Sequence, residues 1–184
     1  KGSGDSKIYT NIFQPHVDAH ISFTKIEPRH QKKLNDEFSL ANADKISPQE
    51  LEAELTRRIP SAEFLAIYDV GQGNANALIS SVHEECPYIY FDMGCGIGSH
   101  KSTTPKNLVF CTCKKPLVIL SHWDTDHWAG ALLNKLKSLS LTWIVPLQQL
   151  DAAHKSFAHE IIAAGGQLLV LEMPSGASGE SKLS

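Results

Sequence analysis

Residues 121–127, with the sequence Ser-His-Trp-Asp-Thr-Asp-His, place two imidazoles and two carboxylates within six positions. Imidazole nitrogen and carboxylate oxygen are ligands that zinc and manganese take from proteins, and a short loop can aim several of them at one point. The sequence therefore predicts a metal-dependent hydrolase whose metal ligands are His122, Asp124, Asp126 and His127. The alternative is a solvated loop in which Asp126 caps a helix that begins near Trp128.

Apolar runs and helical periodicities surround this cluster and would position it. The run from Pro116 to Leu120 directly precedes the loop and has the length of a buried strand. Strands are predicted at 64–69, 77–81, 88–92, 117–120, 142–145 and 168–171, and helices at 48–59, 128–139 and 151–164. Strands come first, and a β-α-β-α-β order follows, which favours a mixed α/β (α+β) fold.

The helix predicted at 48–59 has a clear beginning. Ser47 is a suitable N-cap, Pro48 fits the first turn, and Glu50 is placed to close a capping box. Apolar residues then follow at helical spacing, namely Leu51, Leu55 and Ile59. Two roles are open for this helix: packing on the core of the protein or contacting a partner.

The loop motif H-x-D-x-D-H resembles the H-x-H-x-D-H signature of the metallo-β-lactamase superfamily, with Asp124 in place of the second histidine. Two earlier segments, 69–75 and 91–94, look like those of the branch that includes the hydrolase domain of ComEC-type DNA-uptake proteins. Asn74 departs from the Gly-Gln-Gly-Asp pattern of that branch. The resemblance extends from about Phe64 to Leu171.

The resemblance implies a metallo-β-lactamase-like αββα four-layer sandwich. Too few residues follow His127 for the second half of such a sandwich, so residues 61–184 are expected to hold its N-terminal half, with the C-terminal half missing. Residues 1–60 would be an N-terminal extension. The polar segment 174–181 is expected to be a flexible loop or linker.

In the family, two divalent metal ions share this loop. The resemblance implies that His122 and Asp124 serve the first ion, and that Asp126 and His127 serve the second. Asp126 would also act in catalysis by orienting a metal-bound hydroxide. A carboxylate ligand such as Asp124 favours manganese more than an imidazole ligand does. The two ions could therefore be zinc or manganese.

Three other residues are candidates for smaller roles at this site. Asp92, at the end of a predicted strand, could orient a ligating histidine or could cap a turn. His154 and His159 lie in a predicted helix and are expected to be surface residues. The remaining ligands of each ion are not visible in the sequence.

The reaction predicted by resemblance to this branch is hydrolysis of a phosphodiester, with DNA as a possible substrate. A lactonase, a thioesterase or a β-lactamase would use the same metal chemistry. A third possibility is a non-catalytic split module, completed by a partner or by the missing segment.

Charge and hydropathy constrain the possible partners. The formal net charge of −3 gives no global basic field, and no apolar run reaches the roughly 20 residues needed to cross a bilayer. A local basic stretch could meet phosphates near the loop or be an ordinary solvated face: His100, Lys101, Lys106, Lys114 and Lys115.

The four cysteines, Cys86, Cys95, Cys111 and Cys113, suggest no disulfide framework by their spacing. Reduced thiols and a cytoplasmic location are expected. The C-x-C pair at 111–113 could bind metal, or it could place both thiols on one buried face of a strand.

Overall fold

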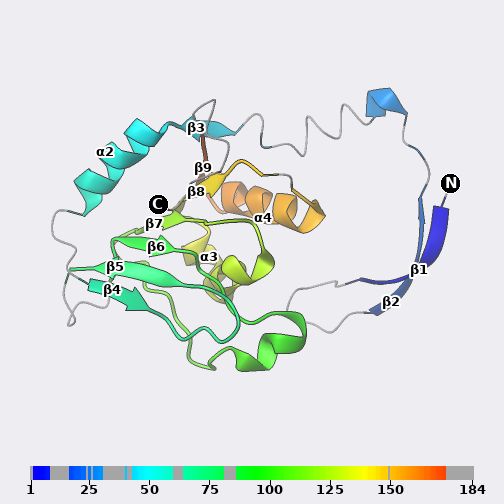
Figure 1. Ribbon diagram of the computed structural model, residues 1–184, viewed down its shortest axis with the longest axis horizontal. Coiled ribbons are helices and arrows are strands. Elements are labelled where there is room, and N and C mark those ends of the chain that lie inside the picture. The colour runs from blue at the N-terminus through cyan, green and yellow to red at the C-terminus, as the bar shows by residue number, and fades with distance from the viewer. Residues whose placement is uncertain are drawn as a thin grey trace, which may run out of the picture.

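The computed structural model describes residues 2–8, 17–23, 25, 27–30, 40, 43–59, 64–80, 86–148 and 150–172. A seven-stranded mixed sheet with the strand order β3-β9-β8-β7-β6-β5-β4 forms its centre (Figure 1). The strands are β3 (Asp44–Ile46), β4 (Phe64–Ile67), β5 (Asn76–Ile79), β6 (Ile89–Phe91), β7 (Leu117–Ile119), β8 (Thr142–Pro146) and β9 (Gln167–Leu171). A separate two-stranded antiparallel sheet consists of β1 (Gly2–Ile8) and β2 (Val17–Phe23). The predicted mixed α/β class is thus confirmed.

The direction of the strands changes at β6. Strands β4, β5 and β6 pair antiparallel, whereas β6, β7, β8, β9 and β3 pair parallel. Because parallel strands end at the same edge of a sheet, the loops after β6 and β7 meet at one edge, and the loops before them meet at the other. We call these the carboxyl edge and the amino edge.

Helices cover both faces of the sheet (Figure 1). On one face, Phe157 and Ile161 of α4 (Ala152–Ala163) pack in a buried cluster with Trp143 of β8. The Phe157 ring stacks on Trp128 with the ring centroids 4.1 Å apart. These buried rings anchor the chain at Trp128, directly after the loop at 121–127, on the α4 face of the sheet.

On the opposite face, α2 (Pro48–Arg58) lies over a smaller apolar cluster that includes Ile89, Leu117 and Ile144. The predicted helix start is confirmed, because the Ser47 hydroxyl accepts from the Glu50 N–H and the Glu50 carboxylate accepts from the Ser47 N–H. The apolar stripe of α2 therefore packs on the core. Since β3 pairs with β9, the segment from β3 to α2 belongs to the same sheet unit as the later strands.

The helix predicted at 128–139 is wrong in type over its first half. A 3-10 segment, η4 (Ala129–Asn134), comes first and only α3 (Lys135–Ser138) is α-helical. The chain is tied here to the loop after β6: the Ala131 N–H donates to the Met93 carbonyl, and a Cβ on Gly130 would lie 2.3 Å from the Gly94 carbonyl oxygen. This close backbone approach sets the local geometry in place of a regular α-helix.

The other predicted elements are confirmed to within one or two residues at each end. The helix at 151–164 ends where expected, because Gly165 adopts a φ of +79° that suits glycine. Among the described residues, no helix has the length and apolarity to cross a membrane. The segment predicted to be a flexible tail, 174–181, lies outside the described residues.

The face of the sheet under α2 is only partly covered. Leu65 and Ile67 of β4 are 60% and 78% exposed, and Phe91 of β6 is 37% exposed. The register of β4, β5 and β6 places these side chains on the same face as Ile89, which α2 covers. The other sheet among the described residues, β1 with β2, lies on the opposite side of Figure 1 from α2.

Candidate functional site

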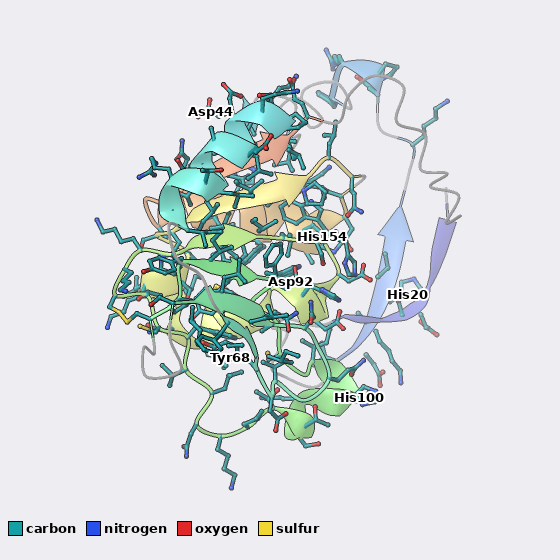
Figure 2. The ribbon with its side chains drawn as sticks, turned by 60° about the vertical axis from the view of Figure 1, so that its left-hand side comes forward. His20, Asp44, Tyr68, Asp92, His100 and His154 are labelled. Atoms are coloured by element: carbon teal, nitrogen blue, oxygen red, sulfur yellow. A yellow bond between two sulfur atoms is a disulfide. The ribbon has the colours of Figure 1, made fainter. Side chains whose placement is uncertain are left out.

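Asp92, the residue after β6, is the centre of a hydrogen-bond network at the carboxyl edge (Figure 2). Its side chain is fully buried and accepts four hydrogen bonds. The Ser121 N–H donates to Oδ1 at 2.7 Å, while Ser121 Oγ, Asn74 Nδ2 and His127 Nδ1 approach Oδ2 at 2.7, 2.8 and 2.7 Å. One buried carboxylate therefore joins the loops that follow β4, β6 and β7.

The backbone of Asp92 is shaped for this position. Its φ of +61° lies in the left-handed region, which aspartate tolerates better than most residues. The Asp92 N–H still donates to the Ile119 carbonyl of β7, and the next N–H, that of Met93, donates to the His127 carbonyl. The chain thus turns sharply at the end of β6 while remaining bonded to β7 and to the loop beyond it.

Glycines allow these loops to touch backbone to backbone. A Cβ added to Gly94 would lie 1.8 Å from the Asp126 carbonyl oxygen, and one on Gly73 would lie 2.6 Å from the same atom. The Asn74 N–H donates to that oxygen at 3.4 Å, and the Gly94 N–H donates to the Asn74 carbonyl at 2.9 Å. The glycines of segments 69–75 and 91–94 are therefore needed to seat the loop at 121–127.

Asp92 fixes the orientation of the His127 ring. A carboxylate oxygen accepts, so the Nδ1 of His127 is the donor in the 2.7 Å contact. In the neutral ring this leaves Nε2 as the nitrogen with a free lone pair. A carboxylate on the far nitrogen is the usual support of a metal-binding histidine, and it corresponds to the role predicted for Asp92.

His122 stands beside Ser121 and Asp124. Its Nδ1 lies 3.0 Å from Ser121 Oγ, whose own proton is directed to Asp92, so this nitrogen donates and Nε2 keeps the lone pair. Nε2 lies 3.2 Å from Asp124 Oδ2. Two ligands of a tetrahedral zinc ion with ordinary bond lengths are about 3.4 Å apart, so the pair fits one shared cation.

The two imidazole rings, His122 and His127, are neighbours with their centroids 3.8 Å apart. The loop therefore places the two candidate imidazole ligands side by side.

Among the described residues, Asp126 forms no hydrogen bond or ion pair with the other three candidate ligands. It lies in the 3-10 turn η3 (Thr125–His127), it makes no capping hydrogen bond to the following segment, and its negative charge acts on the thiol of Cys95. Burial raises the pKa of Cys95, and the charge of Asp126 adds to that rise. The helix-capping alternative for Asp126 is therefore wrong.

Among the described residues, no three of the predicted ligands have their ligand atoms within 4.8 Å of one another. The loop brings His122 together with Asp124 and with His127. The donor types fit zinc or manganese. In this arrangement they supply part of a coordination shell.

One sequence-based expectation near the site is wrong. His154 is not a surface residue, because its side chain is 15% exposed, its Nδ1 accepts from the Asp151 N–H, and its ring lies 6.1 Å from Trp123. Of the basic stretch, Lys114 and Lys115 precede β7 and thus lie at the amino edge, away from the loop. His159 is exposed, as predicted.

The expectation of reduced cysteines is also wrong for two of the four. Cys86 and Cys113 form a disulfide, because the parallel pairing of β6 and β7 brings the segments before both strands to the same edge. The C-x-C pair lies outside any strand, and Cys113 is exposed, so the buried-strand alternative fails as well. Cys95 and Cys111 are free thiols.

Ser121 and Asn74 are the residues whose importance the sequence did not reveal. Ser121 was visible only as a neighbour of the histidines, and Asn74 only as a departure from a family pattern. Both donate to Asp92. The signal that could have identified Asn74 is its need to donate: an ionised aspartate at this position has no proton to offer the buried carboxylate.

Comparison with known proteins returned no match for this chain, whether with family models, with curated proteins or with solved structures. What the site can do therefore has to be inferred from its own residues.

Proposed function

We propose that the carboxyl edge is a metal-dependent hydrolytic site and that the protein acts as a phosphodiesterase or nuclease. The observation that carries the proposal is the buried Asp92, which orients His127 by a 2.7 Å hydrogen bond and fixes the loop through Ser121. A structural loop has no need to orient an imidazole from a fully buried carboxylate. A metal-binding histidine does.

The ligands divide by their position in the loop. His122 Nε2 and Asp124 Oδ2, 3.2 Å apart, would hold one divalent ion. The Nε2 of His127 and the carboxylate of Asp126 would contribute to a second. The mixture of imidazole and carboxylate suits either Zn²⁺ or Mn²⁺.

Divalent ions, when bound, supply an activated water and stabilise the negative charge that develops on the attacked group. The chain's own residues do the positioning. Asp92 holds the His127 ring, Ser121 Oγ holds the His122 ring, and Asp126 would orient the attacking water.

A phosphodiester is the favoured substrate because positive charge lies beside this edge. The turn η2 (Gly98–Thr103) carries His100 and Lys101 and is tied to the loop after β4, since the Gln72 N–H donates to Thr103 Oγ1 at 2.9 Å. Lysine and histidine near a metal site attract phosphate oxygens. Attack on the carbonyl of a lactone, a thioester or a β-lactam is the alternative, because the same metal chemistry serves it.

The fold proposed for this function is the N-terminal half of a four-layer αββα sandwich. Exposed Leu65, Ile67 and Phe91 lie on the part of their sheet face that α2 leaves uncovered, which is where a second sheet would pack. Their exposure supports the proposal that this chain supplies one sheet of two.

The test is metal-dependent cleavage of single-stranded DNA by the full chain in Mn²⁺ or Zn²⁺, beside a lactone and a thioester. We expect D126A to lower the rate of DNA cleavage by about 100-fold or more, as for the loss of a catalytic acid or base. The matched control is D44A, which removes an exposed carboxylate from the remote strand β3. Equal cleavage by D126A and the parent, or cleavage unaffected by a chelator, would overturn the proposal.

A second candidate function is a non-catalytic module completed by another polypeptide segment. The observation that favours it is the incomplete donor set, since no three predicted ligands converge among the described residues. Metal analysis of the purified full chain separates the two. Two tightly bound ions per chain would exclude the split module, and fewer than one, together with no cleavage of any ester, would support it.

A further inference from the structure

A second group of potential metal ligands lies at the amino edge. Cys86 precedes β6, and Cys111 and Cys113 precede β7, and their three sulfur atoms lie within 4.8 Å of one another. Cys86 and Cys113 form the disulfide, and the free Cys111 sulfur is 2.9 Å from that of Cys113. We call these three residues the cysteine cluster.

The backbone around the cysteine cluster is held in place by bonds to the sheet and to α2. Tyr90 is buried, and its hydroxyl donates to the Cys111 carbonyl at 3.1 Å. The Lys115 N–H donates to the Thr112 carbonyl at 3.0 Å, which closes a turn, and the Arg58 guanidinium donates to the Lys115 carbonyl at 2.9 Å. The turn that presents Cys111 and Cys113 is therefore fixed.

A disulfide needs two sulfur atoms, but three converge here. Thiolates around a tetrahedral zinc ion are about 3.8 Å apart, given zinc–sulfur bonds of about 2.3 Å. Here two sulfurs are bonded to each other and the third lies 2.9 Å from one of them, so after reduction the three need only move apart to reach that separation. We propose that, when the disulfide is reduced, Cys86, Cys111 and Cys113 bind one Zn²⁺ ion.

The surroundings suit such a site. Three thiolates and one Zn²⁺ sum to one negative charge, and Lys114 and Lys115 follow directly in the sequence. Cys113 is exposed, and Cys86 and Cys111 are half-buried, so an ion can reach the sulfurs from solvent. The fourth position is open to water.

Reduction by a phosphine supplies the two thiols. The phosphorus lone pair attacks one sulfur and breaks the bond between Cys86 and Cys113. Water then gives its oxygen to phosphorus, which is oxidised to the phosphine oxide, and its two protons go to the two sulfurs. Binding of Zn²⁺ to the three cysteines releases the thiol protons.

The zinc site and the carboxyl-edge site are separate. Cys86 and Asp92 lie beyond opposite ends of β6, as Cys113 and Ser121 do for β7. In Figure 2 the yellow sulfur bond lies at the left of the sheet, away from the labelled Asp92. The two sites can be tested independently.

The experiment uses Co²⁺ as a spectroscopic substitute for Zn²⁺ on the full chain, reduced with a phosphine in metal-free buffer. We expect a thiolate-to-cobalt charge-transfer band that saturates at one Co²⁺ per chain and disappears when Zn²⁺ is added. C111S should abolish the band and weaken Zn²⁺ binding by more than about 100-fold, the upper range for changes outside the ligand shell. C95S, which removes a remote thiol, and D124A, which alters the carboxyl edge, should both keep the band.

Absence of the band in the parent chain, or a full band in C111S, would overturn the proposal. If a variant fails to fold, the proposal can still be tested by alkylation of the parent chain alone. Alkylation of the reduced chain, mapped by mass spectrometry, should be at least about tenfold slower in Zn²⁺ at all three cysteines, because zinc-bound thiolates are shielded. Equal rates with and without Zn²⁺ would rule the site out.

Discussion

The two edges of the same parallel strands are ordered in different ways. At the carboxyl edge, one buried carboxylate accepts four hydrogen bonds and glycines let three loops touch. At the amino edge, order comes from a surface turn, a tyrosine hydroxyl and sulfur atoms partly open to solvent. The groups that order the carboxyl edge are buried, whereas the cysteines at the amino edge are half-buried or exposed.

This difference teaches where each edge can change. Removing a buried carboxylate that accepts several hydrogen bonds costs much free energy, because each donor is then buried without an acceptor and without water. A solvent-open cluster can change its covalent or metal-bound state without unpairing buried groups. The carboxyl edge is therefore suited to a fixed site, and the amino edge to an exchangeable one.

Substitution of Asp92 should have the largest effect. D92A strands the donors of Ser121, Asn74 and His127, so we expect the free energy of unfolding, measured by urea denaturation, to fall by about 3–5 kcal/mol. D92N should cost less, about 1–3 kcal/mol, because asparagine keeps one acceptor and tolerates the left-handed backbone.

Ser138 provides the control for D92A. Its hydroxyl is buried, and among the described residues it has no hydrogen-bond partner. S138A removes a hydroxyl that has no hydrogen bond to lose, so it should not lower the free energy of unfolding. If D92A were as mild as S138A, the carboxyl edge would not depend on the buried carboxylate.

Reduction of the disulfide should have the next largest effect and should act on the amino edge alone. Cys86 and Cys113 are 27 residues apart, and closing a loop of that length in the unfolded chain contributes about 3.5 kcal/mol. Urea denaturation with and without a phosphine, in metal-free buffer, measures this loss. Oxidised C86S should match the reduced parent, and an unchanged midpoint on reduction would show that the cross-link does not constrain the unfolded chain.

A smaller effect is expected from Asn74. N74D puts a carboxylate oxygen where an N–H donates to Asp92 at 2.8 Å, so it should lower the free energy of unfolding by about 2 kcal/mol in metal-free buffer. N74A, which removes the donor without adding charge, should cost less. Stability of N74D equal to that of the parent would mean that the amide is not needed to hold Asp92.

The smallest effect concerns pH and Cys95. Burial raises the pKa of its thiol above the ordinary value of 9.0, so the unfolded chain loses this proton at a lower pH than the folded chain does. The thiol's stabilising contribution is thus complete below pH 9 and declines as pH rises above it. The stability advantage of the parent over C95S, measured by urea denaturation, should shrink between about pH 8 and about pH 10. An advantage constant across that interval would contradict the assignment.

Neighbouring residues in the sequence were enough to predict where some helices begin and end. The start of α2 followed from Ser47, Pro48 and Glu50 because a capping box involves neighbours in the chain. The end of α4 followed from Gly165 for the same reason. The helix expected at 128–139 failed because its first half is tied to Met93, a distant residue that no local pattern reveals.

The sequence by itself determined the strands, the helix caps and a loop rich in metal-binding residue types. Only the tertiary structure decided that Asp92 orients His127, that the charge of Asp126 acts on Cys95, and that three cysteines converge at the amino edge. The physical reason is distance along the chain. Caps and periodicity involve residues within a few positions, whereas these contacts join segments that meet only after β6, β7 and their neighbours pair.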